Sequence, residues 1–157
     1  MRTQIVTREG YNKLKDELDR LWRIDRPETT RKVTWAASLG DRSENADYQY
    51  NKKRLREIDR RVRYLRKCLE NLRIVDYSPQ QEGKVYFGAW VEITNEQDEI
   101  KTFRIVGYDE IFGRNDYISV DSPMARALLS HQINDEISIT INGNSFFWTI
   151  TQINYPD

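Results

Sequence analysis

The stretch "LREIDRRVRYLRKCLENL", Leu55 to Leu72, carries apolar residues at alternating spacings of three and four. This period is typical of a coiled-coil seam, in which one apolar stripe of a helix packs against a partner helix. A shorter stripe with the same period lies upstream, at Tyr11, Leu14, Leu18 and Leu21. The sequence therefore predicts two long helices that pack antiparallel within one chain.

Pro27 interrupts the first predicted helix. A proline inside a helix removes one backbone hydrogen bond and clashes with the preceding turn, so we expect a kink or a restart near residues 25–26. A helix of about thirty residues spans about 45 Å. The two helices would form a long arm, and the turn at its end is the stretch "GDRSENADYQY", Gly40 to Tyr50.

After residue 76 the apolar period changes from helical to two, which predicts strands. The segment 77–83 contains Pro79 and Gly83 and is predicted to be a linker. The strand-like segments are "KVYFGAWVEIT", "IKTFRIVG", "YISVD", "EISITIN" and "SFFWTIT". The predicted fold class is α+β: a coiled-coil arm over 1–76 and a small antiparallel sheet with one short helix over 84–157.

Two local signals fix the turns of this second domain. Asn142-Gly143 is typical of a type I′ hairpin between the last two strands. Ser122 followed by Pro123 predicts the start of the short helix, with the serine as N-cap and the proline at the first helical position.

The net charge of zero hides an uneven distribution. Residues 1–76 hold 20 Lys and Arg against 13 Asp and Glu, whereas residues 77–157 hold 5 against 12. The basic half suits a polyanionic partner and the acidic half does not. The single cysteine, Cys68, excludes an internal disulfide, and no apolar run is long enough to span a membrane, so we expect a cytoplasmic protein.

Basic side chains dominate the second helix. Between residues 52 and 67, nine Lys and Arg oppose only Glu57 and Asp59. One interpretation is a solvated helix face with ion pairs such as Glu57 with Arg61. The other is phosphate binding, for which the planar guanidinium of arginine is well suited. The candidate phosphate-binding residues are Lys52, Lys53, Arg54, Arg56, Arg60, Arg61 and Arg63.

Three acids lie in the stretch at the end of the arm: Asp41, Glu44 and Asp47. Asp41 and Glu44 have the spacing of a capping box, with Asp41 as N-cap and Ser43 as an alternative. The second interpretation is a metal site, because one or two carboxylates commonly hold Mg²⁺ while water and phosphate complete its shell. Two carboxylates one helical turn apart can point at the same place. A second molecule would have to supply the other ligands.

The rest of the sequence predicts no catalytic site of its own. His131 is the single histidine, so neither a zinc site nor a catalytic triad can be assembled. Gly107 and Gly113 belong to turns without a phosphate-loop pattern, and Cys68 lies beside the apolar seam, where packing is its expected role.

The segment "SLGDRSENADYQYNKKRL" resembles the end of the coiled coil in the bacterial Gre transcript cleavage factors. "FRIVGYDE" and "YISVDSPMARALL" resemble their globular domain. The resemblance runs from Val6 to the last strand, is weakest after about His131, and is greatest to the GreB branch. It implies an FKBP-like fold for the second domain. It also implies binding to backtracked bacterial RNA polymerase through the secondary channel, and stimulation of the polymerase's own cleavage of the nascent RNA 3′ end.

The resemblance also implies roles for individual residues. Asp41 and Glu44 would hold a Mg²⁺ jointly with the polymerase and orient the attacking water, so the chain would not itself be an enzyme; the role of Asp47 is left open. The basic run would contact the RNA, and any contact with DNA would be indirect. The residues that would bind the rim of the channel are Ser119, Asp121 and Pro123.

The protein would act as a monomer. Two alternative functions remain: a channel-binding regulator that does not stimulate cleavage, and a basic RNA-binding coiled coil with an accessory sheet domain.

Overall fold

The computed structural model describes residues 2–156 and divides them into two compact units. The helical unit is Tyr11–Leu72, and the sheet unit combines residues 2–10 with residues 73–156. The first residues of the chain thus cluster with the sheet rather than with most of the helices. Within the described residues, no helix is long and apolar enough to cross a membrane.

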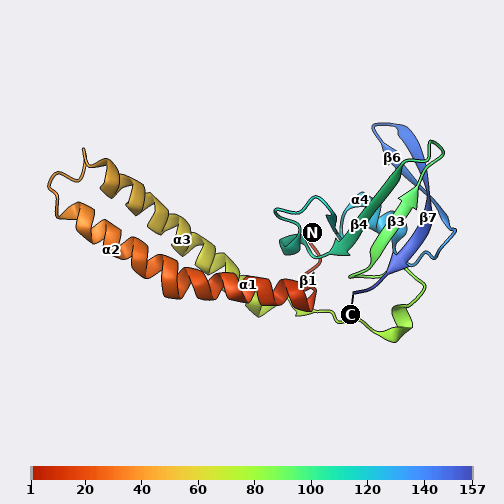
Figure 1. Ribbon diagram of the computed structural model, residues 1–157, viewed down its shortest axis with the longest axis horizontal. Coiled ribbons are helices and arrows are strands. Elements are labelled where there is room, and N and C mark those ends of the chain that lie inside the picture. Colours follow the sequence, from red (N-terminus) through yellow and green to blue (C-terminus); the bar gives the residue numbers. More distant parts are fainter. Residues whose placement is uncertain (1, 157) are drawn as a thin grey trace. The chain divides into compact units, whose positions relative to one another are not determined.

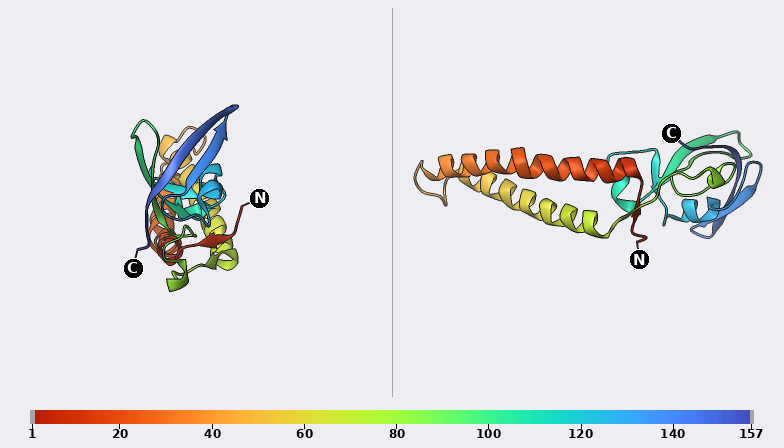
Figure 2. Two further views of the ribbon diagram at one scale, coloured as in Figure 1. Left: turned by 90° about the vertical axis from the view of Figure 1, so that its right-hand side faces the viewer. Right: turned by 90° about the horizontal axis from the view of Figure 1, so that it is seen from below.

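The helical unit is the predicted antiparallel hairpin. Helix α1 (Arg8–Arg20) leads through a π-helical segment, η1 (Leu21–Asp25), into α2 (Arg26–Ala37), and α3 (Ala46–Asn71) returns alongside them (Figure 1 and Figure 2). The predicted seam is confirmed on α3, since every residue buried on that helix follows or adjoins it: Ile58, Val62, Leu65 and Cys68. Leu14, Leu21 and Ala36 are buried on the facing helices.

Pro27 perturbs the first helix without ending it. The backbone N–H of Arg26 donates to the carbonyl of Leu21, five residues earlier, instead of four. Asp25 and Arg26 keep right-handed helical dihedral angles, so the chain continues into α2. Because a proline cannot donate to the carbonyl four residues back, the turn before Pro27 widens, and the predicted kink or restart takes the form of a π-helical segment.

The sheet unit contains five paired strands in the order β5-β4-β3-β7-β6. Their bounds are β3 Trp90–Thr94, β4 Ile100–Val106, β5 Tyr117–Ser119, β6 Glu136–Ile141 and β7 Asn144–Asn154. Four of them pair antiparallel as predicted, but β5 pairs parallel to β4. The sheet is therefore mixed, because the connection over 107–116, with the short helix η3 (Tyr108–Glu110), returns the chain in the same direction.

Both local turn predictions are confirmed. Asn142 and Gly143 have φ values of 52° and 81°, the left-handed pair that a type I′ turn requires, and they join β6 to β7. The single short α-helix of the sheet unit, α4 (Pro123–Leu128), has Ser122 as its N-cap, whose Oγ accepts the N–H of Ala125 at 3.2 Å. Helix α4 contacts β6 and closes the core, in which Val85, Val91, Ile93, Ile105, Leu128 and Ile150 are fully buried. The FKBP-like topology stays a prediction.

The residues before α1 are fastened to the sheet unit. Strand β1 (Ile5–Val6) pairs parallel with β2 (Arg73–Ile74), and the short helix η2 (Pro79–Gln81) follows. The Glu110 carboxylate accepts the backbone N–H and the hydroxyl of Thr7, and also the N–H of Gly107 at 2.8 Å. A Cβ on Gly107 would lie 2.2 Å from the carbonyl oxygen of Ile5, so only glycine permits this close approach.

Candidate functional site

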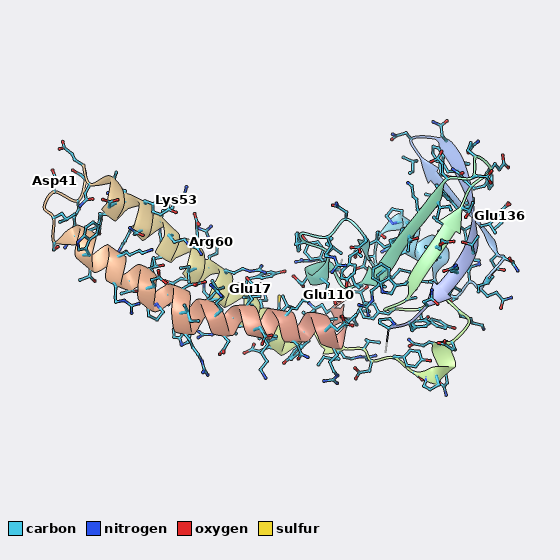
Figure 3. The ribbon with its side chains drawn as sticks, in the orientation of Figure 1. Glu17, Asp41, Lys53, Arg60, Glu110 and Glu136 are labelled. Atoms are coloured by element: carbon cyan, nitrogen blue, oxygen red, sulfur yellow. The ribbon has the colours of Figure 1, made fainter. Side chains whose placement is uncertain are left out.

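The loop between α2 and α3 presents the acids at the end of the hairpin. It spans residues 38–45, and Gly40 turns the chain with a φ of 122°, a value that L side chains rarely adopt. The side chains of Asp41 and Glu44 are exposed in this loop, where Figure 3 labels Asp41. Asp47 is also exposed but lies in the first turn of α3, where a negative charge complements the helix dipole.

The N-cap of α3 is Asn45. Its Oδ1 accepts the backbone N–H of Tyr48 at 3.0 Å, and its Nδ2 donates to the carbonyl of Ala36 at 2.7 Å. The prediction that Asp41 or Ser43 caps the helix is wrong, because the helix begins two or more residues later. An amide both accepts and donates, so the one side chain of Asn45 caps α3 and also ties it to the end of α2. The carboxylates and hydroxyls of the loop make no such pair of bonds.

Asp41 and Glu44 are therefore released from capping. Asp41 Oδ1 accepts the N–H of Ser43 at 2.9 Å and its hydroxyl at 2.8 Å, and these hydrogen bonds lower the pKa of Asp41 below its ordinary value. Among residues 2–156 the Glu44 carboxylate has neither an ion pair nor a hydrogen bond. The two acids lie in a loop and not on one helical face, so the predicted one-turn spacing does not apply.

The donor atoms available here suit a hard cation that another molecule also holds. Within the described part of the chain, no group of three or more His, Cys, Asp or Glu side chains comes together as a metal site. Two carboxylates supply oxygen ligands of the kind that Mg²⁺ takes, and Mg²⁺ commonly keeps water and phosphate for the rest of its shell. Asp41 and Glu44 would be the residues that hold it.

The basic run on α3 is mostly solvent-exposed. Lys53, Arg54, Arg56, Arg60 and Arg63 are exposed, while Lys52 and Arg61 are partly buried (Figure 3 labels Lys53 and Arg60). Arg61 differs from the rest of the run, because its guanidinium holds both oxygens of Glu17 on α1, at 2.7 and 2.9 Å. These hydrogen bonds raise the pKa of Arg61, and they replace the predicted pair with Glu57.

The acids opposing the basic run are partly neutralised from the facing helix. Arg26 Nε donates to Asp59 Oδ1 at 2.7 Å, so one of the two acids in the run is already paired. The exposed arginines and lysines of the run thus keep a larger share of uncompensated positive charge than the sequence alone indicates.

Exposed aromatic side chains on the hairpin were not predicted. Trp22 is 46% exposed, and the guanidinium carbons of Arg66 and Arg26 lie 4.6 and 5.3 Å from its ring centroid. Trp35 and Tyr50, near the loop, are 56% and 69% exposed. The sequence feature that could have identified these aromatic residues is that they lie outside the apolar seam of the hairpin. Rings next to guanidinium groups could stack against nucleic-acid bases.

In the sheet unit, Ser119 and Asp121 belong to one ordered turn. The hydroxyl of Ser119 accepts the N–H of Asp121 at 3.1 Å, and Pro123 follows, exposed, at the start of α4. Asp121 itself accepts the backbone N–H and the hydroxyl of Thr3 at 2.7 and 2.5 Å, and these bonds lower its pKa. Sequence reasoning missed Thr3, since 118 positions separate the two residues and no local pattern joins them.

Two family descriptions match nearly the whole chain. "Transcription elongation factor, N-terminal" of the GreA/GreB type matches residues 4–74, and "Transcription elongation factor, GreA/GreB, C-term" matches residues 80–155. Curated relatives are similar over almost their full length. A protein of Pseudomonas syringae pv. tomato named "Transcription elongation factor GreB" is 64% identical, covering 99% of both chains. Proteins of the same name from Pseudomonas putida and Vibrio cholerae are 66% and 64% identical; each match covers 99% of this chain and 96% or 97% of the relative.

Proposed function

This chain belongs to the GreA/GreB family of transcription elongation factors, and we propose from that membership that its partner is bacterial RNA polymerase. The helical hairpin would enter the secondary channel of a backtracked polymerase, and the protein would stimulate cleavage of the nascent RNA 3′ end. The protein would work as a monomeric cofactor in the cytoplasm, and the polymerase would perform the hydrolysis.

The observation that carries this proposal is that Asp41 and Glu44, the acids of the loop, are exposed and do not cap the helix. Asn45 caps α3, so the structure of the helix end requires neither Asp41 nor Glu44. The pKa of Asp41 lies below its ordinary value, so its carboxylate is ionised at neutral pH. Two exposed carboxylates at the end of an otherwise basic hairpin would be unfavourable near RNA phosphates unless a cation lies between them.

We propose that Asp41 and Glu44 hold a Mg²⁺ jointly with the polymerase. When bound, this ion would stabilise the charge that develops on the phosphodiester and activate a water for attack. Asp41 is kept in place by its bonds to Ser43, so one ligand would be oriented before the partner is met. The exposed lysines and arginines of α3 would bind the phosphates of the extruded RNA.

Ser119, Asp121 and Pro123 are proposed to contact the rim of the channel. They form one turn that the Ser119 hydroxyl and Thr3 hold in place, so the segment presents a fixed surface instead of a mobile loop. A fixed surface loses less conformational entropy on binding.

The test uses halted, backtracked polymerase complexes with labelled RNA and Mg²⁺. Asp41→Asn keeps an Oδ1 that can accept from Ser43, and Glu44→Gln changes a side chain without a partner, so each removes charge but not structure. We expect each to slow RNA shortening by about tenfold or more. Glu57→Gln, the same change at an exposed position of α3, is the matched control and should cleave at the unmodified rate.

Three outcomes separate this function from its alternatives. Unmodified cleavage by both loop variants would remove the metal role. Tight binding to the polymerase without any RNA shortening would indicate a channel-binding regulator. Salt-sensitive RNA binding with no effect on the polymerase would indicate a plain RNA-binding coiled coil. Incubation of the protein with RNA alone, where we expect no cleavage, tests whether the chain is itself a nuclease.

A further inference from the structure

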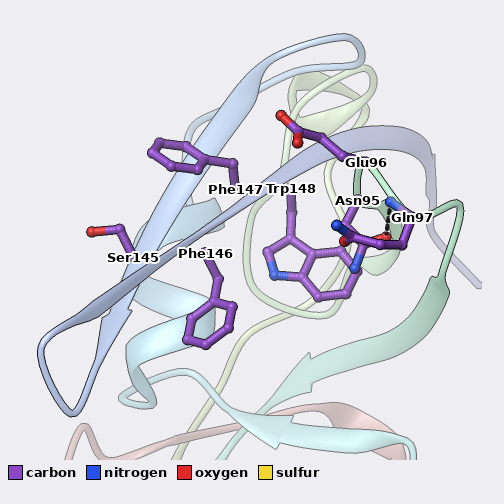
Figure 4. A pocket seen from close by; sticks show the side chains of 7 residues that line it. All are labelled: Asn95, Glu96, Gln97, Ser145, Phe146, Phe147 and Trp148. Atoms are coloured by element: carbon purple, nitrogen blue, oxygen red, sulfur yellow. Dashed lines mark hydrogen bonds between the residues drawn. The ribbon is translucent and has the colours of Figure 1, made fainter.

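The sheet unit has a hollow at one end that the proposed function does not use. The hollow measures about 230 Å³ and is lined by residues 95–97, in the turn between β3 and β4, and by residues 145–148 of β7 (Figure 4). A second hollow of about 320 Å³ shares Asn95, Glu96 and Phe147 with it and extends to Glu136 and three threonines. The two hollows form one surface, which we call the β7 surface.

The β7 surface combines exposed aromatic rings with acids. Phe146 and Phe147 are 46% and 50% exposed, although phenylalanine normally lies inside a folded domain. Two adjacent exposed rings beside a hollow are typical of a contact surface for another molecule. Because side chains alternate along a strand, Phe147 lies on the face of the sheet opposite Phe146 and Trp148. Residues 145–148 pair with β6 but not with β3, whose pairing with β7 ends at Thr94↔Thr149, so the rings lie on both sides of an open strand edge.

The acids of the β7 surface are unpaired. Within residues 2–156, the carboxylates of Glu96 and Glu136 take part in no ion pair or hydrogen bond. Glu96 lies on an ordered turn, because Asn95 Oδ1 accepts the N–H groups of Gln97 and Glu99 at 3.0 and 2.9 Å. The surface therefore carries negative charge next to aromatic rings, and the backbone that carries Glu96 is ordered.

Trp148 already has a cation against its ring. The Lys101 ammonium nitrogen lies 5.2 Å from the ring centroid, within the distance at which a positive charge is attracted to an aromatic face. Aromatic rings and carboxylates together select cationic, partly apolar groups. The carboxylates disfavour nucleic acid, because the acidic half of the chain repels phosphates: residues 77–157 hold 12 acids against 5 basic residues.

We propose that the β7 surface is a docking site for a basic segment of a partner protein. A lysine or arginine of that segment would lie between the Glu96 carboxylate and the aromatic rings, and a neighbouring apolar side chain would pack on Phe147. Charge complementarity is what assigns this occupant.

The β7 surface is separate from the turn at Asp121. Strand β5 pairs with β4 from Arg104↔Tyr117 to Val106↔Ser119, so Asp121 follows the Val106 end of β4. The turn that carries Glu96 joins the opposite end, at Ile100. The seven residues of β4 span about 20 Å. A partner at the β7 surface therefore leaves the turn at Asp121 accessible, and failure of either proposal leaves the other intact.

The test is an NMR titration of the isotope-labelled full chain with the synthetic peptide GRFRG, using GEFEG as the matched acidic control. We expect GRFRG to shift the backbone amides of residues 95–97 and 145–148 and the indole N–H of Trp148, with a Kd on the order of 1 mM. The amides around Asp121 should not move, and GEFEG should produce no shifts.

Three variants localise the binding. Glu96→Gln should weaken GRFRG by about three- to fivefold, the range expected for one exposed ion pair. Glu99→Gln removes the same charge from the same turn but outside the hollows, and should leave the affinity unchanged. Phe147→Ala should weaken the peptide while the dispersion of the spectrum shows that the fold persists, because half of that side chain is already exposed.

Several results would overturn the proposal. One is an equal response to both peptides, or none at about 5 mM GRFRG. Equal losses of affinity for GRFRG in Glu96→Gln and Glu99→Gln would mean that the peptide responds to the overall negative charge of the domain and not to this site. Binding of an oligouridylate at the same amides would assign the surface to nucleic acid. Shifts that depend on protein concentration alone would assign it to self-association.

Discussion

Asn45 explains, at the scale of a single residue, why the loop acids can be free for chemistry. Its amide accepts from the first turn of α3 and donates to the last turn of α2. A carboxylate in its place could cap the helix but could not donate to Ala36. The neighbouring acids Asp41 and Glu44 are then not needed to cap the helix, and their exposed carboxylates remain available to a cation.

Thr3 should control the ionisation of Asp121. Both Asp121 oxygens accept hydrogen bonds from Thr3, and they hold the pKa of Asp121 below its ordinary value. Thr3→Val keeps the backbone N–H but removes the hydroxyl, so we expect the pKa of Asp121 to rise toward its ordinary value. Titration of the Asp121 carboxyl carbon by NMR measures this shift.

The stability effect of this contact has a definite sign. A lowered pKa in the folded state means that the contact stabilises the protein above the unfolded pKa, and that this contribution is lost as pH falls through the folded pKa. Thr3→Val should therefore be less stable than the unmodified protein at neutral pH, and the difference should disappear as pH falls through the lowered folded pKa of Asp121. A difference that persists unchanged in acid would mean that the hydroxyl acts through packing alone.

At the scale of elements, the sequence predicted the helices and turns that are determined by a few neighbouring residues. The three-four spacing of α3, the Asn142-Gly143 turn and the Ser122-Pro123 start of α4 each act over a few residues, and all three are found. Features that depend on distant partners were missed: the Asn45 tie to Ala36, the Thr3 contact with Asp121 and the parallel pairing of β5. The apparent capping box at Asp41 failed for the same reason, because a tertiary bond to α2 decided where α3 begins.

The ion pair between Arg61 and Glu17 should stabilise the contact between α3 and α1. Two hydrogen bonds join the side chains, each of which is about 40% exposed: 41% for Arg61 and 40% for Glu17. We expect a double-mutant cycle of Glu17→Gln and Arg61→Gln to give a coupling energy of about 0.5–1 kcal/mol, weaker in high salt. Urea unfolding measures it.

The control is the cycle of Glu17→Gln with Arg60→Gln. Arg60 is exposed on the same helix, and the structure gives it no contact with Glu17. That cycle should give no coupling, and equal coupling in both cycles would mean that the effect comes from net charge rather than from the contact.

At the scale of the whole molecule, charge separates two kinds of partner. Basic residues outnumber acids in residues 1–76 and acids outnumber basic residues in residues 77–157, so each half repels the ligands that suit the other. On the two proposals, one chain of zero net charge would meet RNA with its helices and basic protein segments with its sheet. Salt should weaken both contacts, but for different reasons. Binding of the helices to RNA releases counterions from the RNA, and high salt opposes that release, whereas at the sheet salt screens single ion pairs.

RNA binding should therefore distinguish the arginines of α3. Arg60 and Arg63 are exposed and unpaired among the described residues, whereas Glu17 holds Arg61. Each phosphate contact on a single strand contributes about 0.7 to the slope of log K against log salt, so Arg60→Gln with Arg63→Gln should lower the slope by about 1.4. Arg61→Gln, of the same charge change, should lower it little. Fluorescence anisotropy of a labelled oligouridylate across a salt series measures all three, and an equal fall for Arg61→Gln would mean that overall charge, not exposed arginines, sets the affinity.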